Sequence, residues 1–105
     1  MTERIAPGDL DADAWGTRAT LVQFSTEVCS RCPGTRRLLH RVADTRDGVT
    51  VLDVDVTHRP DLARRFTLRA SPTVLVLDAD GTPRSRFDGP PQPADVEREL
   101  SLLDA

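Results

Sequence analysis

The fold of this chain is decided by the segment TLVQFSTEVCSRCPGT, residues 20–35. Its first five residues are mostly apolar and predict a short buried strand. Two cysteines follow, Cys29 and Cys32, and the chain contains no others. A bridge between them would close a loop too small to stabilise a whole domain, so the pair is better suited to chemistry than to stapling the fold.

The cysteine pair lies between this strand and a helix predicted from residue 35 onward. The apolar positions of that helix share one face: Leu38, Leu39, Val42 and Ala43. A helix N-terminus carries unsatisfied N–H groups and a positive potential, which stabilise a thiolate. We therefore predict that Cys29, the more exposed cysteine, attacks a substrate disulfide and that Cys32 then resolves the mixed disulfide.

The start of this helix is open to two interpretations. Pro33 biases the residue before it away from helical dihedral angles, and the glycine after it weakens a helix start. Either the helix begins at Pro33, so that Cys29 gains less from the helix dipole, or the motif lies on an opened first turn. In both cases Arg31, Arg36 and Arg37 add positive charge near the pair.

The rest of the chain predicts alternating strands and helices. We expect strands at residues 49–56, 73–77 and 84–87, helices at 60–66 and 93–103, a turn at 78–81, and a short helix at 9–15. The continuous apolar run at 73–77 is typical of a central strand, and Pro83 places the last strand at an edge. A strand–helix–strand unit is parallel and right-handed, whereas a hairpin adds antiparallel strands. The predicted fold class is α/β, with a mixed sheet flanked by helices on both sides.

Length and charge favour one folded domain. The chain has 105 residues and a net charge of −3, so we expect a single domain over residues 1–105, with an abbreviated N-terminal segment at 1–19. The pI of about 5.3 argues against a nucleic-acid-binding face. No apolar run is long enough to span a membrane, and the first residues lack the apolar stretch of a signal peptide. We expect a cytoplasmic monomer that binds neither nucleic acid nor membranes.

Together, these motifs resemble the thioredoxin family. The resemblance covers residues 21–103 and rests on the strand at 21–24, the CxxC motif, residues 53–56 and 66–73, Asp80-Gly81 and Gly89. It implies a thioredoxin-like fold, thiol–disulfide exchange with protein substrates, a thioredoxin-reductase-type electron donor and no cofactor.

The resemblance also implies which residues bind the substrate. It implies a cis bond before Pro72, which would face the dithiol, and backbone hydrogen bonds from Ser71 to an extended substrate segment. We assign Ser30 and Arg31, between the cysteines, to substrate binding as well.

Three departures from common thioredoxins stand close to the motif. Val28 replaces the tryptophan that usually precedes the first cysteine, and Gln23 replaces a buried aspartate that the family uses for proton transfer. The family's neighbouring lysine is missing because the chain contains no lysine. Deprotonation of Cys32 would then rely on water or another group. The main interpretation is a thiol–disulfide oxidoreductase; the alternative is a thioredoxin-fold protein-binding or redox-sensing module with little turnover.

A zinc site is the other chemistry open to the cysteines. It would need His40 and His58 as further ligands, but the spacing fits no zinc-finger pattern. His40 also falls on the polar face of its predicted helix. We predict no metal and treat both histidines as surface residues.

Overall fold

A four-stranded mixed sheet organises residues 3–104, which are the residues that the computed structural model describes. The elements in chain order are η1 (Pro7–Leu10), β1 (Ala19–Ser25), α1 (Cys32–Asp44), β2 (Val49–Asp55), α2 (Pro60–Arg65), β3 (Thr73–Asp78), β4 (Pro83–Asp88) and α3 (Pro93–Leu103). The strand order is β2-β1-β3-β4, with β1 parallel to β2 and the other neighbours antiparallel. The predicted mixed sheet, the central position of β3 and the edge position of β4 are confirmed.

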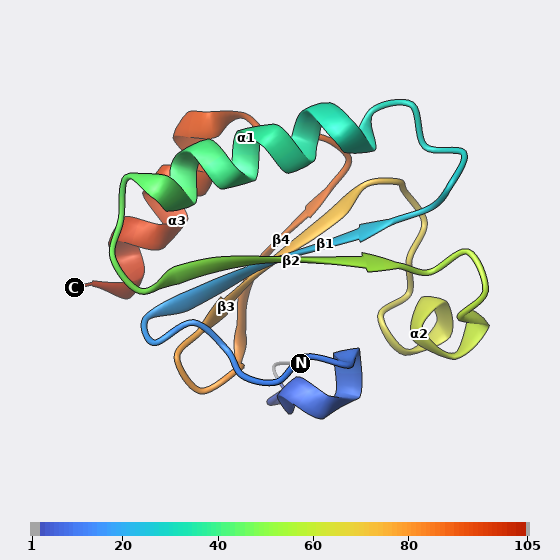
Figure 1. The fold of residues 1–105 in the computed structure, drawn as a ribbon, viewed down its shortest axis with the longest axis horizontal. Helices are drawn as coiled ribbons and strands as arrows, with labels where there is room; N and C mark the ends of the chain where they lie inside the picture. Colours follow the sequence, from blue (N-terminus) through green and yellow to red (C-terminus); the bar gives the residue numbers. More distant parts are fainter. Residues whose placement is uncertain (1–2, 105) are drawn as a thin grey trace.

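Helices cover both faces of the sheet, as predicted. Helices α1 and α3 lie on one face, and α2 and the N-terminal segment lie on the other (Figure 1). The core under α1 and α3 consists of Ala19, Leu21, Leu39, Val42, Val74, Val76, Val96 and Leu100. The core on the opposite face consists of Ile5, Leu10, Val22, Phe24, Val54, Leu62, Leu75 and Leu77.

Strand β1 holds the functional site in place. All seven of its residues are buried, so the loop that follows it starts from a fixed point. Successive side chains of a strand point to opposite faces, so Leu21 packs in the α1–α3 core and Phe24 in the other. Gln23 shares the face of Leu21 and lies under the start of α1. The cysteine motif therefore emerges from the end of a fully buried central strand.

The N-terminal segment differs from its prediction. No helix forms over residues 9–15; a 3-10 turn at Pro7–Leu10 takes its place. The Asp9 carboxylate accepts the Ala6 N–H at 3.1 Å, and Asp11 ends the turn in the left-handed region, with φ 59°. The alternating Asp and Ala residues offer no apolar helix face. Trp15 packs against the core and donates its indole N–H to the Ile5 carbonyl at 2.8 Å.

Gly81 is required by the turn between β3 and β4. Its φ is +87°, and a Cβ there would collide with the Ile5 carbonyl oxygen and the Trp15 indole. We expect Gly81→Ala to lower the free energy of unfolding by about 2 kcal/mol or more, from a left-handed alanine and overpacking. Denaturant unfolding measures this loss. Gly8→Ala is the matched control, because nothing lies within 4 Å of its Cβ position; an equal loss in the two variants would refute the steric explanation.

Asp78 stabilises the same turn through its carboxylate. Burial opposes its ionisation, but hydrogen bonds from the Thr82 N–H, the Arg84 side chain and the Asp80 N–H outweigh burial and lower the pKa of Asp78. A lowered pKa stabilises the fold above the unfolded value of about 3.9 and loses that effect as pH falls through the folded value.

We therefore expect a pH-dependent effect from Asp78→Asn. At pH 7 the substitution should cost about 1 kcal/mol of unfolding free energy, and the difference from wild type should shrink below about pH 4. Urea unfolding at several pH values measures it. Asp80→Asn removes the same charge from an exposed neighbouring position and should show little change; a pH-independent loss in Asp78→Asn would argue against the carboxylate's role.

Candidate active site

The two cysteines lie where β1 meets α1 and form a disulfide, with their Cα atoms 5.5 Å apart. Cys32 is the first residue of α1 and is only 2% exposed. Cys29 lies three residues earlier in the connecting loop and is half-buried. The prediction that Cys29 is the more accessible cysteine is confirmed. An incoming disulfide can therefore approach Cys29 more readily than Cys32.

The start of α1 lies one residue before the position given by the first interpretation, in which the helix begins at Pro33. The helix begins at Cys32 with Arg31 as its N-cap residue, and Pro33 lies in the first turn. A proline is tolerated there because that N–H has no partner within the helix. No side chain caps this end, and its first turn contains no acidic residue. The positive end of the helix is therefore uncompensated beside the dithiol, although Cys29 lies outside the helix itself.

Two of the three predicted arginines keep their charge available near the motif. Arg36 pairs with Asp53 at 3.0 Å, so its charge is largely neutralised. Arg31 and Arg37 are exposed and make no ion pair within residues 3–104. Between residues 29 and 37, the free positive charge thus comes from these two side chains and the helix end.

The Ser71–Pro72 loop packs directly against the cysteine motif. The peptide bond between these residues is cis, the isomer that the resemblance implies. The Ser71 Oγ lies 3.7 Å from the Cys32 Sγ and 3.5 Å from the Thr26 Oγ1. The Arg31 guanidinium donates to the Ser71 carbonyl at 3.4 Å. The structure thus brings Ser71 and Arg31 together beside the disulfide, while their roles in substrate binding stay predictions.

Gln23 lies beneath the motif and is fully buried. Its side-chain amide donates to the Cys32 carbonyl at 3.0 Å, and its Oε1 atom has no hydrogen-bond partner. The neutral amide thus fastens the first residue of α1 to the central strand. The sequence offered one signal for this contact, a polar glutamine within the apolar run that ends at Phe24.

A shallow apolar groove opens beside the Ser71 loop, and sequence reasoning missed it. Its volume is about 410 Å³. It is lined by Phe24, Thr26, Val28, Val56, Thr57, Ala63, Leu68, Arg69, Ala70 and Ser71. Val28 is 87% exposed although it is a large apolar residue. The walls of the groove come from four separate segments of the chain. Val28 alone, a β-branched residue beside the cysteine motif, therefore does not indicate a groove in the sequence.

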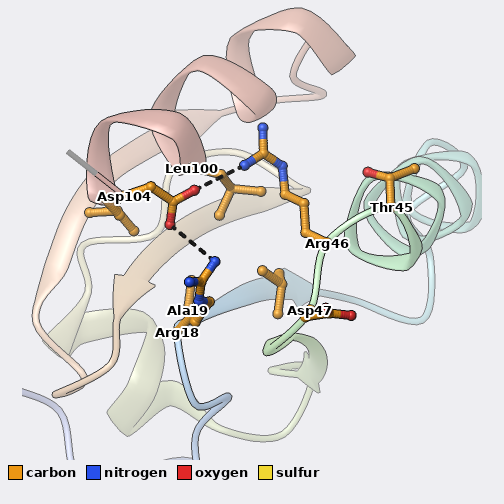
Figure 2. Close-up of a pocket in the computed structure, with 9 residues that line it drawn as sticks. Arg18, Ala19, Thr45, Arg46, Asp47, Leu100 and Asp104 are labelled. Atoms are coloured by element: carbon orange, nitrogen blue, oxygen red, sulfur yellow. Dashed lines mark hydrogen bonds and ion pairs between the residues drawn. The ribbon is translucent and has the colours of Figure 1, made fainter.

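A second hollow of about 250 Å³ lies at the opposite end of β1, far from the dithiol. Arg18 and Arg46 converge on the Asp104 carboxylate (Figure 2). The N···O distances of these two ion pairs are 3.8 and 3.4 Å. Arg46 also bonds to the Ser101 hydroxyl and the Glu97 carbonyl. These contacts tie α3 to the segment before β1 through Arg18 and to the loop after α1 through Arg46, so we assign this hollow a structural role.

His40 and His58 are both exposed, as predicted for surface residues. Residues 3–104 contain no group of three or more His, Cys, Asp or Glu side chains placed to hold a metal ion. No helix in the same part of the chain combines the length and apolar character that a membrane crossing requires.

The comparisons with known proteins decide the family. Residues 11–101 match the family model described as Thioredoxin. The chain belongs to the thioredoxin family. The thioredoxin of Mycolicibacterium smegmatis is 33% identical over 104 residues, which cover 95% of this chain and 92% of that protein. A bifunctional thioredoxin reductase/thioredoxin of Mycobacterium leprae is 31% identical over 85 residues, 80% of this chain and 18% of that protein.

The fold agrees with the family. The crystal structure of chloroplastic thioredoxin z has a TM-score of 0.72 and 24% identity to this chain, covering 84% of it and 80% of the other. With the disulfide at the CxxC motif, family membership shows that this protein is a thiol–disulfide oxidoreductase that acts through this dithiol. The main interpretation of the sequence is confirmed.

Proposed function

We propose that this thioredoxin-like protein reduces disulfides in protein substrates, with Cys29 as the nucleophile and Cys32 as the resolving thiol. The observation that carries this order of attack is the difference in burial: Cys29 is accessible from outside, whereas Cys32 is 2% exposed. The uncompensated helix end supports an anionic sulfur at this position.

The reaction transfers two electrons from the dithiol to the substrate. The Cys29 thiolate attacks one substrate sulfur, the substrate S–S bond breaks, and the other substrate sulfur leaves as a thiolate that takes up a proton. Cys32 then loses its proton, and its thiolate attacks the Cys29 sulfur of the mixed disulfide. The second substrate sulfur leaves, and the Cys29–Cys32 disulfide seen in the structure is the oxidised product.

The substrate segment binds beside the cysteines in an extended conformation. Ser71 and Pro72 present a backbone edge next to Cys32, and no backbone hydrogen bond occupies the Ser71 N–H or carbonyl within residues 3–104. Ser30 and Arg31 flank the site from the cysteine loop. The adjoining groove, with exposed Val28 on its wall, offers room for an apolar substrate side chain.

Turnover needs a donor that returns the disulfide to the dithiol. We assign this role to a thioredoxin-reductase-type enzyme, since the Mycobacterium leprae relative is a bifunctional thioredoxin reductase/thioredoxin. A reducing cytoplasm suits a chain whose two cysteines both serve in the motif. We propose that residues 1–105 act there as a single-domain monomer with an abbreviated N-terminal segment 1–19. Within residues 3–18 of that segment, η1 and its flanking loops pack on the α2 side of the sheet.

An insulin-reduction assay with dithiothreitol tests catalytic turnover. The wild-type protein should accelerate insulin precipitation well above the rate with dithiothreitol alone, and Cys29→Ser should match the uncatalysed rate. Acceleration by Cys29→Ser would refute the assignment of the nucleophile. The rival redox-sensing module predicts one exchange per molecule and no acceleration; the neutral Gln23 beneath the dithiol favours that slower behaviour.

A further inference from the structure

Arg31 lies across the backbone edge that the proposed substrate would use. Its guanidinium donates to the Ser71 carbonyl at 3.4 Å, from a side chain that is exposed to solvent. That distance is long for a hydrogen bond, so the contact is weak and easily exchanged. A substrate that pairs with Ser71 must therefore share or displace this guanidinium.

Arg31 also lacks the carboxylate partner that many arginines of this chain have. Arg36, Arg59 and Arg86 each contact an aspartate within about 3 Å. Neither Arg31 nor Arg69 forms an ion pair within residues 3–104. Their charges are therefore available to a ligand, in a protein whose net charge is −3.

Arg31 and Arg69 reach the proposed substrate path from two different segments. Arg31 belongs to the cysteine loop, whereas Arg69 lies two residues before Ser71 and lines the apolar groove. Arg37 adds a third exposed arginine, because it lines a hollow together with Arg31 and Ser30. These arginines therefore line the two hollows beside the cysteine motif, and no carboxylate lines either hollow; Glu27, in the loop before Cys29, is exposed and lines neither.

We propose that the preferred substrate is an extended segment with an acidic residue beside its disulfide cysteine, and that Arg31 is the main determinant of this preference. This inference rests on the proposed function of the same site. A substrate Asp or Glu draws the Arg31 guanidinium away from the Ser71 carbonyl and pairs with it. The same movement uncovers the carbonyl for the substrate backbone, so charge recognition and backbone pairing occur together.

Two disulfide-linked peptides that differ only in Glu or Gln beside the cysteine test the proposal. The second-order rate constant for reduction of each peptide by the pre-reduced protein gives kcat/KM for that peptide. Dividing it by the rate constant for reduction of the same peptide by dithiothreitol alone corrects for the intrinsic reactivity of the peptide. At low salt the wild type should prefer the Glu peptide about three- to fivefold, as expected for exposed ion pairs. The preference should fall as ionic strength rises, because salt screens exposed charges, and it should appear in KM.

Arg31→Gln should reduce the ratio between the two peptides to near one. The ratio within one variant cancels any change in Cys29 reactivity. Arg41→Gln is the matched control: it removes the same charge from an exposed arginine without an ion pair, ten residues and therefore about 15 Å further along α1. Its ratio should equal that of the wild type.

The outcomes separate the inference from the proposed function. Reduction of both peptides at equal corrected rates by the wild type would overturn the inference and leave disulfide reduction standing. A full Glu preference in Arg31→Gln would equally overturn the role of Arg31. If the wild-type protein reduces neither of the two peptides and does not reduce insulin, the proposed function is overturned, and the inference with it.

Discussion

Replacing Cys32 with serine is expected to trap a substrate on Cys29 as a stable mixed disulfide. The resolving thiolate is then missing, so the reaction stops after the first bond exchange. Turnover in the insulin assay should fall to the rate with dithiothreitol alone, as it should for Cys29→Ser, but only the Cys32 variant should hold a trapped substrate. Non-reducing electrophoresis and mass spectrometry of the adduct, after mixing with a disulfide peptide, measure the trapped fraction.

Cys29→Ser is the matched variant for this experiment. It retains the buried Cys32, which is 2% exposed, and should form no adduct under the same conditions. In the reduced wild-type protein, brief alkylation at neutral pH should label Cys29 first. Preferential labelling of Cys32, or an adduct in Cys29→Ser, would reverse the assignment of the two cysteines.

Gln23→Asp is expected to change both the speed of resolution and the stability of the fold. An aspartate beneath Cys32 can accept its proton, so resolution of the mixed disulfide should accelerate by about tenfold or more at neutral pH. The same carboxylate would be fully buried, without a lysine anywhere in the chain to pair with it. Ionisation should cost about 3 kcal/mol of unfolding free energy.

The pH dependence of this loss has a definite sign. Burial raises the pKa of the introduced carboxyl above its unfolded value of about 3.9. The loss of unfolding free energy is therefore small below about pH 3.9. It grows as the pH rises and levels off above the pKa of the carboxyl in the folded state. Urea unfolding between pH 3 and 8, together with the rate of mixed-disulfide resolution, measures both effects.

Gln23→Asn separates charge from side-chain length. The asparagine side chain, like the aspartate, is one methylene shorter than the glutamine whose amide donates to the Cys32 carbonyl at 3.0 Å. Gln23→Asn should therefore lose about 1 kcal/mol of unfolding free energy for that hydrogen bond at every pH. It should not accelerate resolution, because an amide accepts no proton in this range. If the Asp and Asn variants behave alike in both measurements, residue 23 does not serve as a proton-transfer position in this protein.

The strands and helices that surround the site could be predicted from local patterns. The apolar run at residues 73–77, which forms most of β3, carries the signal of a continuous buried strand. The helix at Pro93–Leu103 carries the signal of a proline followed by apolar residues at helical spacing. The N-terminal segment could not be predicted in the same way. There Trp15 and Leu10 are held by the core and by the Ile5 carbonyl, and such long-range contacts leave no periodic signal.

The same distinction applies to the site. The cysteine motif and its position before a helix are local features, and the placement of Ser71 followed from the resemblance. The hydrogen bonds from Arg31 to Ser71 and from Gln23 to Cys32 join residues 40 and 9 positions apart. Their geometry depends on how β1, α1 and the Ser71 loop pack, which the sequence does not state. The sequence also leaves the first residue of α1 open, because Pro33 and the glycine after it weaken a helix start; the structure places it at Cys32.

The central claim is that the Cys29–Cys32 dithiol gives two electrons to a protein disulfide, and a single-turnover experiment tests it most directly. The reduced protein, freed of reductant, is mixed with an equimolar disulfide substrate, quenched with an alkylating reagent and analysed by mass spectrometry. We predict one Cys29–Cys32 disulfide formed for each substrate disulfide lost, with two alkylated substrate thiols appearing in step. A protein that keeps both thiols while the substrate stays oxidised would contradict the claim.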